Sequence, residues 1–179
     1  NMMLFSKDSE NLINYTFHLN IQHIFVKKVC FKSPDSAYTP WIGSGMKSVG
    51  MENIDSFKLT KNPISRTTLA LFAGASGDHN PIHRDLDFVK KAAIDDVFAH
   101  GMLGMAYLGQ LLTNNFSQEK IKKYSAKFLS ITQIGAEFSL SGHIIEEIVL
   151  DGDKCLKIEI KAEDQHQDIK IVGEAIIAL

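Results

Sequence analysis

Hydrophobic and polar positions divide the chain into a strand-like start, a helical middle and a strand-like end. Residues 16–31 alternate loosely between apolar and polar side chains, and β-branched and aromatic residues dominate, which predicts a strand. Residues 33–51 are rich in Ser, Pro and Gly, as turns and linkers are, and a short strand is expected at 54–59. We place the one candidate boundary in the polar stretch, with the main domain over 46–179 and an N-terminal extension over 1–45 that is either a separate module or an extra strand of the main domain.

The middle of the chain has helical spacing. Ser65 is expected to cap a helix whose apolar face includes Leu69, and which ends near residues 74–77. Asp85 or Asp87 is expected to cap a second, short helix.

A longer apolar segment follows, from about residue 101 to 114. Its side chains are apolar almost all round, which predicts a helix that is buried on most sides. Gly104 and Gly109 weaken such a helix intrinsically, so we expect another element to pack close to its backbone.

The final third of the chain is strand-like throughout. Strands are predicted over 128–138, 142–150, 155–162 and 169–178, and the Asp-Gly-Asp sequence at 151–153 predicts a hairpin turn. Helices followed by a run of antiparallel strands indicate an α+β domain whose sheet wraps around the long central helix.

Composition narrows the class of protein. The 179 residues carry a net charge of −2, which gives no general attraction to nucleic acid or to an anionic membrane. No apolar run approaches the roughly 20 residues that cross a bilayer. Cys30 and Cys155 lie far apart and form no disulfide framework, which favours a reducing compartment. We therefore expect a soluble, cytoplasmic protein without a nucleic-acid or membrane partner.

The residues best suited to chemistry lie in one short loop. Gly77 and Pro81 punctuate a segment that holds a carboxylate, a carboxamide and an imidazole, from Asp78, Asn80 and His83. Each of these residues alone is also an ordinary turn former or structural residue. An Asp and a His that lie close together can hold one water molecule between them and move a proton to or from it.

A second candidate lies where the long helix begins. Gly101 stands at the predicted helix N-terminus, where unpaired N–H groups and the helix dipole favour a developing negative charge. The alternatives are that Gly101 only lets the chain enter a crowded helix and that His100 is a structural or hydrogen-bonding residue. No phosphate-binding, dinucleotide-binding, zinc or calcium motif is present in the sequence, so we expect no metal.

Two segments resemble a known family. Residues 72–83 (Phe-Ala-Gly-Ala-Ser-Gly-Asp-His-Asn-Pro-Ile-His) resemble the signature of the MaoC-like dehydratases, the (R)-specific enoyl-CoA hydratases. Residues 99–103 (Ala-His-Gly-Met-Leu) fall where that family has its own His-Gly-Met. The resemblance covers about residues 50–179 and implies a hot-dog fold, in which an antiparallel sheet wraps around a long helix.

The resemblance also implies an activity. Asp78 and His83 would be the catalytic dyad and Asn80 a supporting residue. Gly101 and His100 would lie on the substrate side, with the Gly101 amide as the oxyanion donor. The enzyme would be a hydro-lyase that reversibly hydrates trans-2-enoyl thioesters of CoA or acyl carrier protein to (R)-3-hydroxyacyl thioesters, in fatty-acid or polyhydroxyalkanoate-type metabolism. No metal or redox cofactor is implied.

One departure, one further similarity and two alternatives accompany this interpretation. Some family members have a Ser in the central helix where this chain has Gly109, and residues 16–33 are faintly similar to the first strand of the SecB export chaperone. The alternatives are a hot-dog acyl-CoA thioesterase and a non-catalytic acyl-thioester-binding or chaperone-like module. Besides the acyl thioester, the expected partner is a second copy of the chain or a second hot-dog subunit.

Overall fold

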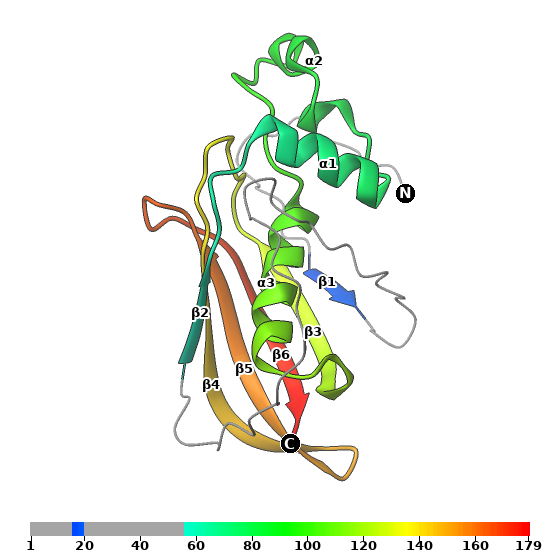
Figure 1. Ribbon diagram of the computed structural model, residues 1–179, viewed down its shortest axis with the longest axis vertical. Coiled ribbons are helices and arrows are strands. Elements are labelled where there is room, and N and C mark those ends of the chain that lie inside the picture. The colour runs from blue at the N-terminus through cyan, green and yellow to red at the C-terminus, as the bar shows by residue number, and fades with distance from the viewer. Residues whose placement is uncertain (1–15, 20–55) are drawn as a thin grey trace, which may run out of the picture.

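The computed structural model describes residues 16–19 and 56–179, which form one antiparallel sheet with a long helix against one face and shorter helices at one end (Figure 1). From one edge to the other, the six strands are β1 (Thr16–Leu19), β3 (Ile121–Phe128), β6 (Ile169–Ala178), β5 (Asp153–Glu163), β4 (Ser139–Leu150) and β2 (Ser56–Thr60). All neighbouring strands pair antiparallel. The predicted α+β class, with a sheet around a long helix, is confirmed.

The long helix α3 (Gly101–Asn115) lies along the concave face of the sheet (Figure 1). Leu108 and Leu111 on α3 and Ile158 on β5 are fully inaccessible to solvent, because the inward positions of the strands meet the apolar side of the helix. Met102 and Ala106 lie on the exposed side of the same helix. The helix is therefore buried along its sheet-facing side only.

Gly104 allows α3 to approach the sheet closely. A Cβ atom at this position would collide with Ile171 Cδ1 on β6 and lie 3.4 Å from Phe138 Cζ. A Cβ at Gly109 would meet Tyr124 Cε1 at 3.6 Å, an ordinary contact distance. The expectation of a close packing partner is confirmed at Gly104. At Gly109 a Cβ atom would fit at an ordinary contact distance, so no such close approach occurs there.

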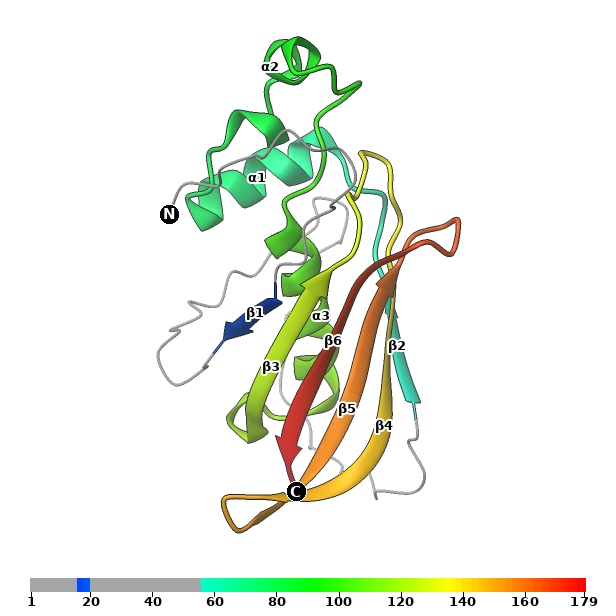
Figure 2. The same cartoon turned by 180° about the vertical axis from the view of Figure 1, so that it is seen from behind.

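Two shorter helices lie together at one end of the sheet, beyond the start of α3 (Figure 2). Helix α1 (Arg66–Ser76) begins at Ser65, whose Oγ accepts a hydrogen bond from the Thr68 N–H at 3.0 Å, and it ends at Gly77, where φ is +75°. Helix α2 (Leu86–Lys91) is capped by Asp85, which accepts from the Phe88 N–H at 3.0 Å. Both predicted helices are confirmed, the second with Asp85 as its cap.

The strand predicted over 128–138 is wrong. Strand β3 ends at Phe128, and it follows a short 3₁₀ helix, η3 (Gln118–Lys120), rather than a continued α-helix. Residues 129–138 form an irregular connection, in which the Gly135 N–H donates to the Ile64 carbonyl oxygen at 2.8 Å. The lysines that precede Phe128 hid the strand, because they occupy its solvent-facing positions and mask the apolar alternation.

The hairpin between β4 and β5 has the geometry that the sequence predicts. Leu150 pairs with Asp153, so Asp151 and Gly152 form the two-residue turn, with φ angles of 52° and 88°. These positive values match the primed turns of tight hairpins, which favour Asp-Gly.

The predicted strand over 16–31 is described only at Thr16–Leu19, and its remainder lies outside the described residues.

Among the described residues, no helix combines the length and the apolar character that a bilayer span requires.

Candidate active site

A chain of local hydrogen bonds shapes the loop after α1. The Asp78 N–H donates to Ser76 Oγ at 3.2 Å, and the Asn80 N–H donates to Asp78 Oδ1 at 3.3 Å. Asn80 Oδ1 then accepts from the Ile82 N–H at 3.2 Å and caps a 3₁₀ turn, η2 (Pro81–His83). Asp and Asn side chains commonly close turns in this way. The loop thus fixes the Asp78 carboxylate and delivers His83 at the end of the turn.

Three sequence-predicted residues come together in space. A carboxylate oxygen of Asp78 and ring nitrogens of His83 and His100 all lie within 4.8 Å of one another. The imidazole rings of His83 and His100 are stacked, with their centroids 3.9 Å apart and their planes at 30°. His83 is 9% exposed and His100 is 1% exposed, whereas Asp78 is open to solvent. The structure therefore joins the loop of residues 77–83 to the start of α3.

Backbone carbonyl groups fix which nitrogen of each ring carries a hydrogen. His83 Nδ1 lies 2.8 Å from the Phe98 carbonyl oxygen, and His100 Nε2 lies 3.1 Å from the Asp78 carbonyl oxygen. A carbonyl oxygen only accepts, so both of these nitrogens must donate. In the neutral rings, His83 Nε2 and His100 Nδ1 therefore carry the free lone pairs.

The surroundings of His83 favour its neutral form. Burial lowers the pKa of His83 below its usual value, and the neighbouring His100 lowers it further. The Phe98 carbonyl and the Asp78 carboxylate raise the pKa of His83, but by less than burial lowers it. A neutral imidazole with a free Nε2 lone pair is the form that can accept a proton.

Gly101 is the first residue of α3, next to His100. Among the described residues, its N–H has no hydrogen-bond partner, as is expected in the first turn of a helix. A Cβ atom on Gly101 would lie 3.1 Å from Phe128 Cε1, closer than side chains normally pack. The lack of a side chain therefore lets the Phe128 ring pack closely against the helix N-terminus.

Replacing Gly101 with Ala should disturb this close contact. We expect the added methyl group to displace the Phe128 ring and, with the enoyl thioester substrate that the sequence resemblance implies, to lower kcat/KM by about tenfold, because small displacements near reacting atoms are costly. Adding Phe128→Leu should restore part of the loss. Steady-state kinetics of both variants test this expectation, and a Gly101→Ala protein with the activity of the unchanged chain would contradict it.

Asp78, His83 and His100 are also the one set of acidic and imidazole side chains, within the described part of the chain, that is close enough to share a metal ion. A shared ion would have to lie in the plane of both rings, along their lone pairs. The two rings instead face each other, with their planes at 30°. This arrangement suits proton transfer around the His83 Nε2 atom better than a metal centre.

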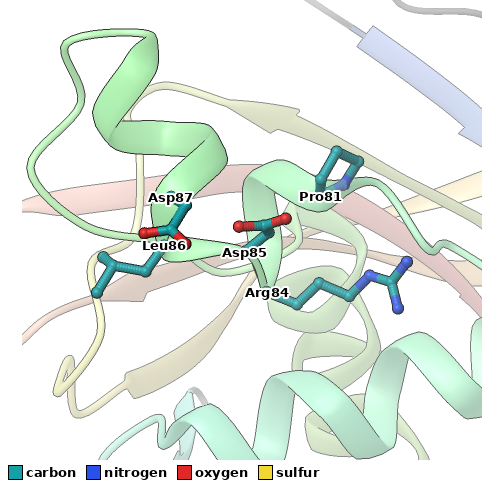
Figure 3. Close-up of a pocket in the computed structure, with 5 residues that line it drawn as sticks. All are labelled: Pro81, Arg84, Asp85, Leu86 and Asp87. Atoms are coloured by element: carbon teal, nitrogen blue, oxygen red, sulfur yellow. The ribbon is translucent and has the colours of Figure 1, made fainter.

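A cavity of about 470 Å³ lies beside this loop (Figure 3). Its lining residues are Pro81, Arg84, Asp85, Leu86 and Asp87. Figure 3 shows that Arg84 extends away from Asp87, and the Arg84 Nε atom donates to the His79 carbonyl oxygen at 3.1 Å. Neither Asp78 nor His83 lines this cavity, so it adjoins the candidate site without containing it.

Sequence reasoning missed the aromatic and backbone groups around the imidazole pair. Phe98 supplies the carbonyl oxygen that holds His83, and its ring packs edge-on against His83 with centroids 5.2 Å apart. Phe72 on α1 packs against His100 with ring centroids 5.0 Å apart. Phe72 belongs to the apolar face of α1, but no sequence signal identifies a particular backbone carbonyl as a partner.

Comparison with known proteins identifies the family of the chain. The sequence model of the MaoC like domain matches residues 53–165. No curated protein matches the chain. The R-hydratase PhaJ1 from Pseudomonas aeruginosa is similar in structure, with a TM-score of 0.60 and 22% identity over 69% of this chain and 79% of that one.

Two further solved structures are similar. The (R)-hydratase from A. caviae involved in PHA biosynthesis has a TM-score of 0.61 and 22% identity, over 74% of this chain and 99% of that one. A chain of the ChsH1–ChsH2 complex from Mycobacterium tuberculosis has a TM-score of 0.58 and 15% identity, over 68% of this chain and 92% of that one. These similarities confirm the hot-dog fold that the sequence resemblance implied. Since the match of the family model covers most of the described domain, the chain belongs to the MaoC-like domain family.

Proposed function

We propose that the chain is a hydro-lyase that reversibly adds water to a trans-2-enoyl thioester and forms an (R)-3-hydroxyacyl thioester. The observation that carries this proposal is the convergence of Asp78, His83 and His100 beside the first residue of α3. Membership of the MaoC-like domain family and the structural similarity to two R-hydratases support the same reaction class. Under this proposal Asp78 and His83 are the catalytic dyad.

In the proposed reaction, one water molecule binds between the Asp78 carboxylate and His83 Nε2. The carboxylate accepts one hydrogen bond and orients the water, while Nε2 removes the other proton. The water oxygen attacks C3 of the enoyl group, and the π electrons move toward the thioester carbonyl oxygen. Asn80 acts on this step only through the loop, because its Oδ1 atom caps the turn that ends at His83.

The negative charge that develops on the thioester oxygen is stabilised by the Gly101 N–H and the N-terminal end of α3. The proton held by His83 then passes to C2, which completes the addition of H and OH and regenerates the neutral ring. No electron leaves the substrate and no step passes through a metal, so the chelator EDTA should leave turnover unchanged.

Turnover of a chain-length series tests the proposal. The purified chain is mixed with trans-2-enoyl-CoA substrates of increasing acyl length, and loss of the ultraviolet absorbance of the conjugated double bond is followed. We expect hydration at one or more lengths. Free thiol is measured in parallel, because release of CoA without loss of the double bond would identify a thioesterase instead, and binding without either change would identify a non-catalytic module.

The pH dependence should report the shifted pKa of His83. The reaction needs His83 neutral, and burial lowers the pKa of His83 below the usual value of about 6.5. We therefore expect kcat/KM to stay constant as the pH falls to about 6.5 and to decline only at lower pH. The folded state resists protonation of His83, so any stability linked to this group is also lost as pH falls through the lowered pKa. Circular dichroism at each pH separates the two effects, and a decline already centred above about 6.5 would contradict the expectation.

The carrier and the assembly are part of the proposal. We propose that the acyl group arrives on CoA or acyl carrier protein and that the chain works in the cytoplasm as a homodimer or paired with a second hot-dog subunit. The similar ChsH1–ChsH2 structure is a complex of two different proteins. Light scattering of the purified chain, together with its turnover alone, distinguishes a self-sufficient homodimer from a chain that needs a partner.

A further inference from the structure

His100 connects three groups that the proposed reaction needs at fixed relative positions: Asp78, His83 and the Gly101 amide. It is the residue that precedes α3, so its backbone leads directly into Gly101. Its ring Nε2–H donates to the carbonyl oxygen of Asp78 at 3.1 Å, and its ring face stacks on His83 with centroids 3.9 Å apart. One buried side chain thus contacts both members of the dyad and adjoins the oxyanion donor.

The burial of His100 separates it from substrate. Its side chain is 1% exposed and is covered on another side by the Phe72 ring, at a centroid distance of 5.0 Å. Its Nε2–H is occupied by the Asp78 carbonyl, so no hydrogen of the neutral ring remains for a thioester oxygen. The prediction that His100 binds substrate directly therefore has less support from the geometry than a role through its neighbours.

One feature of His100 is not explained by stability alone. Its Nδ1 atom is buried and has no hydrogen-bond partner within the part of the chain that the structure describes, and its side chain makes no capping hydrogen bond to the start of α3. A buried acceptor without a partner is unfavourable, and an apolar ring of similar size would avoid it. An apolar ring would, however, lose the hydrogen bond to the Asp78 carbonyl oxygen.

We propose that His100 is a positioning residue of this site. Its Nε2–H holds the Asp78 loop against the start of α3, and its ring is the surface on which His83 packs. Both contacts fix the dyad relative to the Gly101 amide. This inference rests on the proposed function for its kinetic readout, but its structural consequence for His83 can be measured without any substrate.

Two substitutions separate the hydrogen bond from the ring. His100→Gln retains a donor, because the Gln amide nitrogen is as many bonds from Cβ as His Nε2 is. His100→Phe retains a ring of similar shape but has no donor. We expect His100→Phe to lower kcat by about 10²-fold with KM within a few fold of the parent, and His100→Gln to stay within about tenfold of the parent. The exposed His143 on β4 provides the matched control, His143→Gln, which should retain full activity.

A nuclear magnetic resonance titration of the His83 ring gives a second readout. The titratable groups that act on His83 are Asp78 from its own loop and His100 from the start of α3. Removal of the His100 imidazole removes a neighbour that lowers the pKa of His83, so this pKa should rise in both variants and stay unchanged in His143→Gln.

The outcomes separate this inference from the proposed function. If the parent chain hydrates no enoyl thioester, the proposed function fails, while the His83 titration still tests the role of His100. If His100→Phe does not fold, the kinetics of His100→Gln and the titration of His83 in that variant test the inference. Full activity of a folded His100→Phe, equal losses in both variants, or an unchanged His83 titration would each overturn the inference.

Discussion

Replacing Asp78 with Asn should lower kcat/KM for crotonyl-CoA by about 10²-fold, because the proposed reaction depends on a water molecule that the Asp78 carboxylate orients. The substitution is nearly isosteric. Asp78 Oδ1 accepts the Asn80 N–H at 3.3 Å, and the Asn carbonyl oxygen can accept the same bond, so the loop should keep its shape. The substitution removes the negative charge that, in the proposed reaction, orients the water beside His83.

A matched substitution controls for a general effect of removing one carboxylate. Asp95 is exposed and makes no ion pair or side-chain hydrogen bond within the described residues, so Asp95→Asn should retain full activity. Circular dichroism and thermal melting establish that both variants fold. A folded Asp78→Asn protein that hydrates crotonyl-CoA at the parent rate would remove Asp78 from the dyad.

Replacing Gly173 with Ala should have the largest effect on folding. A Cβ atom at this position on β6 would collide with the Ser125 carbonyl oxygen and lie 3.1 Å from Ala126 Cα, both on the neighbouring β3 backbone. Backbone atoms cannot turn aside as a side chain can, so β3 and β6 must move apart. We expect a loss of about 3 kcal/mol or more in the free energy of unfolding, and a melting temperature lower by about 10 °C.

Substitutions at two other glycines provide reference values for this loss of stability. A Cβ on Gly142 would meet the ring of Phe57, a side chain that can shift, so Gly142→Ala should cost less than Gly173→Ala. Gly74 lies in α1 with no atom within 4 Å of its added Cβ, and Gly74→Ala should stabilise the chain by about 0.5–1 kcal/mol. Urea denaturation of the three variants measures this order, and a Gly173→Ala protein as stable as Gly74→Ala would contradict it.

Local signals in the sequence were sufficient for most of the elements. The caps at Ser65 and Asp85 and the turn at Asp151 and Gly152 depend on hydrogen bonds and φ angles within a few residues, so the sequence specifies them. Strand β3 was misplaced because its lysines mask the apolar alternation, and its partner strand β6 lies far away in the sequence. Whether residues 1–45 form a separate extension remains a prediction.

The candidate site was predictable only in part. The loop motif identified Asp78, Asn80 and His83, and the helix start identified His100 and Gly101. The stacking of the two imidazole rings and the carbonyl oxygens that orient them depend on how the loop and α3 meet in space. Such tertiary contacts have no periodicity or spacing in the sequence that would reveal them.

The central claim is that a neutral imidazole and a carboxylate, facing the open end of α3, add water to one face of a conjugated thioester. The most direct measurement is the configuration of the product after the purified chain acts on crotonyl-CoA, determined by chiral chromatography. We predict (R)-3-hydroxybutyryl-CoA, formed without release of free CoA. Formation of the (S) product, or of free CoA with the double bond intact, would contradict the account.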